Sequence, residues 1–156
     1  MDLFPAGFTL RQATLSDSGA IAKFIDESVL IHRNLDWQPL LNWVTLEPFL
    51  LRLENKKITA LLSCAPDPEG IAWIHAFGVR SWNSNLNKVW TTLLDMALET
   101  LKSLKSDLYS VSLFDWFSRL LRETGFSIPQ NIVVLSWGGS PLSPAFHPPE
   151  VSIRPM

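Results

Sequence analysis

The chain has 156 residues, of which 47% are apolar and 18% charged, and its formal net charge is −2. A chain of this length is the size of one domain and buries roughly 70% of the surface that its unfolded form exposes. This composition excludes a disordered chain, and the lack of basic excess argues against nucleic-acid binding driven by phosphate neutralisation. We therefore expect one compact domain with no nucleic-acid partner.

The N-terminal stretch lacks both a basic region and a long apolar region, so we expect no signal peptide. The apolar runs are far shorter than the roughly 20 residues that a membrane helix needs. We therefore expect a cytoplasmic protein without a membrane partner. The single cysteine, Cys64, lies in an apolar run, which predicts a buried thiol.

Residues 8–13 alternate apolar and polar side chains, which predicts a half-buried strand. Thr14 and Asp17 then form a capping-box pattern at the start of an apolar-periodic segment, which predicts a first helix reaching to about residue 31. A second, shorter helix is expected around residues 39–44.

The segment from residue 47 to residue 80 has the residue pattern of strands and turns. It contains the strand-like runs EPFLLRLE, KKITALLSCA and IAWIHAFGV, separated by the turn sequences ENKK and PDPEG, and so predicts an antiparallel meander. Apolar residues from Leu86 to Leu104 then recur on one helical face, which predicts the longest helix of the chain.

A strand over residues 108–113 and a short helix follow, with Asp115 expected as the N-cap and Gly125 as the left-handed stop. NIVVLSW, residues 131–137, predicts one more strand. This order predicts an α/β fold with a mixed, mostly antiparallel central sheet and helices on both faces. The domain spans residues 8–137, and residues 138–156 form a Pro-rich linker or tail.

The tail contains SIRP, which echoes TLRQ near the N-terminus. Either this similarity is chance, or the tail is the start of a second repeat of the domain.

Four stretches, FTLRQATLSD, IAWIHAFGV, LNKVWTTLLDMALE and SRLLRETGF, occur in the order and spacing of a known family. Over residues 8–137 the chain resembles the GCN5-related N-acetyltransferase superfamily. The resemblance implies that acetyl-CoA binds through backbone groups of splayed central strands around residues 76–80. It also implies that the pyrophosphate lies on the N-terminus of the long helix, in a loop of pattern Arg/Gln-x-x-Gly-x-Gly/Ala.

The motif residues of this chain depart from that pattern. Aligned on the family's paired aliphatic residues, Asn85 stands at the Arg/Gln position, Lys88 at the first glycine and Trp90 at the second. Together with Phe77 and Val79 of the central strand, these three residues are our candidate cofactor-binding residues. Trp90 would either fill the phosphate site or pack into the core, and Lys88 would either contact phosphate or be an ordinary exposed lysine.

The catalytic position departs as well. Many members carry a tyrosine four residues before the Gly-Phe pair, and here that position is Leu121, while the only tyrosine, Tyr109, lies on the preceding strand. The resemblance leaves His75 as the candidate general base, and a structural role for this histidine is the alternative. His32, His75 and His147 are too far apart in sequence to indicate a metal site.

Three functions remain open. The first is a degenerate acetyltransferase-like domain with weakened or lost acetyl-CoA binding, which acts in regulation, in dimerisation or beside a second domain of the same type. The second is an active N-acetyltransferase that transfers acetyl from acetyl-CoA to an unknown amine. The third is a small-molecule binding module that holds an apolar ligand in the V-shaped cleft between strands, with Trp73, Trp82 and Trp90 as its candidate walls.

Overall fold

The computed structural model describes residues 7–35, 38–81 and 85–128. Every helix and strand discussed below lies in the compact unit Met1–Phe126, which is described by itself. Among the described residues, none of the helices combines the length and the apolar character needed to cross a bilayer.

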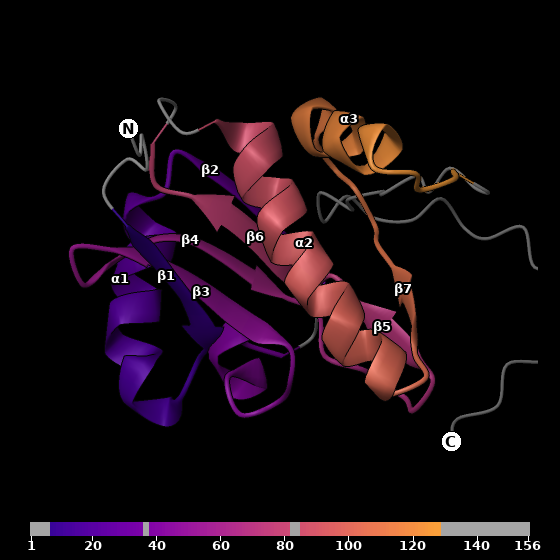
Figure 1. Ribbon diagram of the computed structural model, residues 1–156, viewed down its shortest axis with the longest axis horizontal. Coiled ribbons are helices and arrows are strands. Elements are labelled where there is room, and N and C mark those ends of the chain that lie inside the picture. The colour runs from indigo at the N-terminus through magenta and orange to yellow at the C-terminus, as the bar shows by residue number, and fades with distance from the viewer. Residues whose placement is uncertain (1–6, 36–37, 82–84, 129–156) are drawn as a thin grey trace, which may run out of the picture. The chain divides into compact units, whose positions relative to one another are not determined.

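The central sheet is antiparallel throughout (Figure 1). Its strands are, in spatial order, β1 (Phe8–Gln12), β3 (Phe49–Glu54), β4 (Lys57–Ser63), β6 (Ala76–Val79) and β2 (Leu30–Arg33). The β3–β4 hairpin turns at Asn55 and Lys56, which both have positive φ, as a tight hairpin turn requires. This hairpin and its pairing with β6 confirm the predicted meander.

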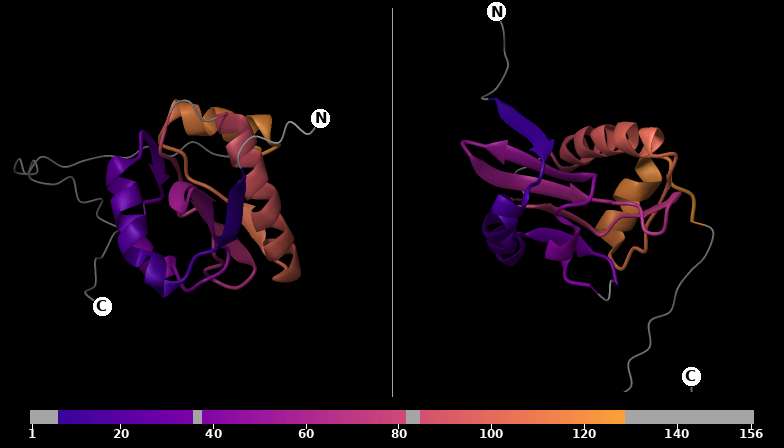
Figure 2. Two further views of the ribbon diagram at one scale, coloured as in Figure 1. Left: turned by 60° about the vertical axis from the view of Figure 1, so that its left-hand side comes forward. Right: turned by 90° about the horizontal axis from the view of Figure 1, so that it is seen from below.

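Helices cover both faces of this sheet (Figure 2). On one face lie α1 (Ser18–Glu27) and the 3₁₀ turns η1 (Leu15–Asp17) and η2 (Leu40–Trp43), and on the other lie α2 (Leu86–Ser103) and α3 (Asp115–Glu123). Neighbouring residues in a strand serve opposite faces, because successive side chains alternate. Leu50 and Leu62 join the core under α2, whereas Leu51 and Leu61 join the core under α1. The predicted α/β architecture is confirmed.

The strand predicted for IAWIHAFGV is divided in two. Its first part, β5 (Ile71–Trp73), pairs in parallel with β7 (Asp107–Tyr109), and its second part, β6, belongs to the central sheet. Ile74 and His75 connect the two parts: the Ile74 N–H donates to the carbonyl of Tyr109, and the His75 N–H donates to that of Ser63. The two halves of the run therefore have different neighbours.

The first helix is shorter than predicted. It ends at Glu27, and Leu30–Arg33, expected as its last turn and the following loop, forms strand β2. The Ser28 hydroxyl donates to the carbonyl of Phe24, and Ser28 itself is extended (ψ 133°), so the chain leaves the helix there. β2 alternates buried and more exposed side chains, with Leu30 and His32 inside, as a strand packed on one face does.

Smaller differences concern element ends. The helix expected at 39–44 is the 3₁₀ turn η2, and the strand expected at 108–113 is only β7. Asp115 is the first residue of α3 and Phe114 occupies the cap position, while Gly125 has the predicted left-handed φ of 94°. The predicted strand at 131–137 and the tail at 138–156 lie outside the described residues.

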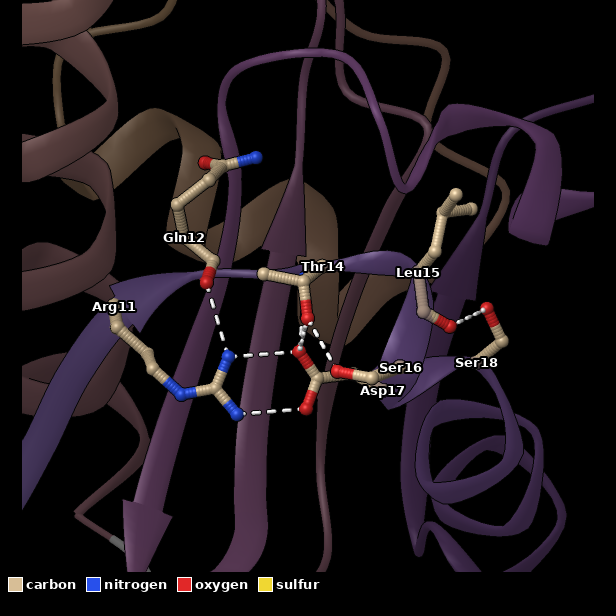
Figure 3. A network of polar contacts seen from close by, with 7 residues as sticks. All are labelled: Arg11, Gln12, Thr14, Leu15, Ser16, Asp17 and Ser18. Atoms are coloured by element: carbon tan, nitrogen blue, oxygen red, sulfur yellow. Dashed lines mark hydrogen bonds and ion pairs between the residues drawn. The ribbon is translucent and has the colours of Figure 1, made fainter.

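A polar network joins β1 to the start of α1 (Figure 3). The Arg11 guanidinium donates two hydrogen bonds of 2.7 Å to the Asp17 carboxylate, which also accepts the Thr14 N–H at 2.8 Å. The predicted capping box of Thr14 and Asp17 is therefore present. Chiefly because of the Arg11 hydrogen bonds, the pKa of Asp17 lies well below its usual range.

Candidate functional site

The edge of β6 is the part of the fold where the resemblance places the cofactor. β6 lies between β4 and β2, so both rows of its backbone N–H and C=O groups face a neighbouring strand. The β2 pairing runs from Leu30 opposite Val79 to Arg33 opposite Ala76, and it continues with the Asn34 N–H donating to the His75 carbonyl at 2.8 Å. Strand β2 therefore occupies the edge of β6 that faces away from β4.

Gly78 shows how closely β2 approaches. A Cβ atom added to Gly78 would lie 2.6 Å from the Ile31 Cδ1 atom and 3.3 Å from the Leu30 carbonyl oxygen. The glycine therefore leaves just enough room for the β2 side chain. Phe77 and Val79, its neighbours and two of the candidate cofactor residues, are 0% and 1% exposed, so both side chains belong to the core.

Aromatic rings fill the space between β6, β2, α2 and α3. The His32 ring of β2 stacks on Phe117 of α3, with centroids 4.0 Å apart and planes 20° apart. Phe77 contacts both Trp90 of α2, at 4.9 Å, and Phe117, at 6.0 Å. This aromatic cluster, formed by His32, Phe77, Trp90 and Phe117, joins all four elements beside the paired edge.

Trp90 belongs to the core, which is one of the two alternatives that its sequence position allowed. Its side chain is 0% exposed and meets Phe117 edge to face at 5.6 Å. Its indole N–H donates to the Thr124 hydroxyl at 3.1 Å, which ties α2 to the end of α3. A buried tryptophan with a satisfied N–H is held firmly in place.

Asn85 and Lys88 lie at the N-terminus of α2. Asn85 is the N-cap, and its side-chain oxygen accepts the Lys88 backbone N–H at 3.1 Å. One of the N–H groups that a phosphate would use is therefore already bound. Lys88 is exposed, in the first turn of the helix. Residues 82–84, which precede this turn in the sequence, lie outside the described residues.

His75 is buried at the junction of β5 and β6, with 3% of its surface exposed. Its ring stacks on Trp43 at 3.7 Å and 16°, and its Nε2 atom lies 3.2 Å from the Ala65 carbonyl oxygen. Because a carbonyl oxygen only accepts hydrogen bonds, Nε2 is the donor in this contact. His75 also lines a pocket of about 340 Å³.

This pocket is not lined by Leu121, Tyr109 or Cys64, which the sequence also singled out. Leu121, at the position of the family's tyrosine, is buried in the core, and Tyr109 packs beside Trp73 on the small sheet. Cys64 is fully buried, and burial raises the pKa of its thiol to about 12. In the part of the chain that the structure describes, no three His, Cys, Asp or Glu residues gather as a metal site would require.

The feature that sequence reasoning missed is β2. Its signal was the short apolar run of Leu30 and Ile31, which a histidine and an arginine follow. That signal was hidden because Val29 continues the helical spacing of Ile21 and Ile25.

Comparisons with known proteins agree with this architecture. No family model matches the sequence, and a search of curated protein sequences gives no significant match. The fold does match solved structures. PaiA N-acetyltransferase from Thermoplasma acidophilum, in complex with coenzyme A, is 13% identical with a TM-score of 0.64, and the match covers 81% of this chain and 93% of that one.

Two further matches are similar. Polyamine N-acetyltransferase from Drosophila melanogaster is 12% identical with a TM-score of 0.63, covering 76% of this chain and 82% of that one. Ard1 from Thermoplasma volcanium is 15% identical with a TM-score of 0.62, covering 79% and 84%. The chain therefore has the fold of the GCN5-related N-acetyltransferases, as the sequence resemblance predicts.

Proposed function

We propose that this chain is a non-catalytic domain with the acetyltransferase fold, which does not bind acetyl-CoA in the manner of the family it resembles. The observation that carries this proposal is the pairing of β2 with β6. In the resembled family, the cofactor uses backbone groups of the splayed central strand. Here those groups face β2, and a cofactor would have to displace four strand residues to reach them.

The aromatic cluster supports the same conclusion. Displacing β2 would separate His32 from Phe117 and expose apolar surface that is buried, with β2's Leu30 8% and His32 0% exposed. Fully burying one large apolar side chain contributes about 1.5–3 kcal/mol. Part of the binding free energy of the cofactor would offset the cost of displacing β2. The apparent affinity of the chain for the cofactor would therefore fall.

The helix terminus supports it further. Trp90 stands at the motif's second glycine, and Asn85 already uses the Lys88 N–H. A phosphate approaching this terminus would therefore compete with an N-cap and would lack the glycines that permit close approach. The residues of the chain do not fit acetyl-CoA, and we derive no transfer step through it.

A non-catalytic domain of this fold would act through its surfaces, in regulation, in dimerisation or beside a second domain of the same type. The alternative is an active N-acetyltransferase, and the similarity in fold to acetyltransferases favours it. Two of the matched structures are an agmatine N-acetyltransferase and a polyamine N-acetyltransferase, so agmatine and polyamines are the first acceptors to assay.

Calorimetric titration of the purified chain with acetyl-CoA tests the proposal. We expect no saturable binding at millimolar cofactor, with an active acetyltransferase as the positive control. A dissociation constant in the low micromolar range would contradict the proposal. Acetylation of agmatine at a rate above that of a boiled sample would contradict it as well.

Hydrogen exchange, measured by mass spectrometry, reports on the strand itself. We expect amides of residues 30–33 and 76–79 to be protected equally with and without acetyl-CoA, because the pairing stays intact. Faster exchange at 30–33 in the presence of the cofactor would mean that β2 is displaced, and would favour the active alternative.

A further inference from the structure

A pocket of about 340 Å³ opens where β5 ends, next to the hydrogen bond between the Asn34 N–H and the His75 carbonyl that continues the β2–β6 pairing. Trp43, Trp73 and His75 line it, and Asn34, Gln38 and Asp67 bring polar groups to it. This volume is at the small end of the range of roughly 300–1,000 Å³ that ligand pockets span. The pocket is thus of a size for a small organic molecule.

The aromatic surfaces of this pocket are held in place. Trp43 is 6% exposed and stacks on His75, whose ring is fixed by its contact with the Ala65 carbonyl oxygen. Trp73 is half-buried and packs against Tyr109, with ring centroids 5.7 Å apart. The part-exposed indole ring of Trp73 offers a π face that attracts a cation, while Trp43 and His75 form a packed base beneath the pocket.

Among the described residues that line the pocket, Asp67 is the one carboxylate and none is a lysine or an arginine. None of the ion pairs found among the described residues involves Asp67. Its backbone is fixed, because the Asp67 N–H donates to the Ile71 carbonyl at 2.8 Å. An exposed carboxylate beside tryptophan rings favours a positively charged ligand.

We propose that this pocket binds a small quaternary ammonium ion. A primary ammonium carries three N–H donors, each of which loses a hydrogen bond to water unless the pocket replaces it. The aromatic rings of the lining replace few of these bonds and only Asn34, Gln38 and Asp67 bring acceptor oxygens, whereas a fully methylated nitrogen has no N–H to satisfy. Its charge is spread over methyl groups that pack on indole faces, and the Asp67 carboxylate adds attraction at the rim.

Such a ligand has no N–H that an acetyl group could replace, so the pocket acts in binding and not in turnover. The site lies at the end of the β2–β6 pairing, where Asn34 and His75 line it. Its titration needs no acetyl-CoA, so failure of this proposal and failure of the proposed non-catalytic function are separate results.

Calorimetric titration with choline tests the proposal, and 3,3-dimethylbutan-1-ol, a neutral molecule of nearly the same shape, is the matched ligand. We expect choline to bind at least about tenfold more tightly than the neutral alcohol, because only choline carries the charge. Ethanolamine, which has the same skeleton with a primary ammonium, is expected to bind more weakly than choline.

The substitution Asp67→Asn keeps the shape of the side chain and removes its charge, and Trp73→Leu removes a π face. Each is expected to weaken choline binding about tenfold. Glu69→Gln is the control, since Glu69 is exposed and close to Asp67 in sequence but does not line the pocket. The affinity of this variant for choline should equal that of the unsubstituted chain.

Three results would overturn the proposal: no heat of binding with millimolar choline, equal binding of choline and ethanolamine, or an unchanged affinity in Asp67→Asn. Asp67 is exposed, so its variant is expected to fold. Circular dichroism and the thermal midpoint of each variant verify this before titration.

Discussion

Gly78 of β6 lies directly opposite Ile31 of β2, and an added Cβ would come within 2.6 Å of the Ile31 Cδ1 atom. We predict that Gly78→Ala destabilises the chain by about 1–3 kcal/mol, because an extra methyl group must push β2 outward. Ile31→Val removes the clashing atom and alone costs about 0.5–1.5 kcal/mol. The free energy of unfolding of both variants is measured by urea titration.

The double variant identifies the contact. Because Ile31→Val makes room for the new methyl group, the double substitution should cost at least about 0.5 kcal/mol less than the sum of the two single ones. Ile74→Val is the control partner, since Ile74 is not among the nearest contacts of a Cβ added at Gly78, and its effect should be additive. Additivity in the Gly78 and Ile31 pair would mean that β2 does not pack there.

The hydrogen bond between Trp90 and Thr124 gives a second prediction. Thr124→Val keeps the shape of the side chain and leaves the buried indole N–H without its acceptor, so we expect a loss of about 1–2 kcal/mol in the free energy of unfolding. Thr91→Val is the matched control: Thr91 also donates to a helix carbonyl, that of Asn87, but no tryptophan depends on it. Equal losses in the two variants would assign the effect to the helix bonds alone.

Cys64 gives a third prediction, which concerns reactivity. Burial raises the pKa of its thiol to about 12, so almost no thiolate forms at pH 8 and the sulfur is shielded from reagents. We expect no reaction with Ellman's reagent in the folded state and full reaction of the chain's one thiol in denaturant. Rapid labelling of the folded chain would show that the β4 end opens.

Local patterns in the sequence predicted most of the fold. The long helix follows from apolar side chains at helical spacing, and Leu93, Leu94 and Ala97 are buried as that spacing requires. The Asn55 and Lys56 turn and the Thr14 cap follow from residue types that favour these structures. Each of these features depends on residues close together in sequence.

The site was less predictable, because it depends on long-range pairing. Whether Leu30–Arg33 forms a strand is decided by β6, which lies more than 40 residues later and offers an unpaired edge. The sequence could show that Trp90 replaces a glycine and that Asn85 caps the helix. It could not show that Trp90 meets Phe77 and Thr124, since these contacts depend on the positions of three elements.

The Arg11 and Asp17 pair gives the last prediction, which concerns the stability of the fold at low pH (Figure 3). Because the folded chain lowers the pKa of Asp17, this carboxylate stabilises the fold above its unfolded pKa of about 3.9, and the contribution is lost as the pH falls below that value. Asp17→Asn should therefore lower the free energy of unfolding at pH 7 by about 1–2 kcal/mol. At pH 3 the difference from the unsubstituted chain should narrow.

Urea titrations at the two pH values measure the free energy of unfolding. Asp26→Asn, at an exposed position, is the control and should change this free energy by less than about 0.5 kcal/mol at both pH values. A difference that is the same at pH 3 and pH 7 would show that Asp17 acts through its shape and not through its charge.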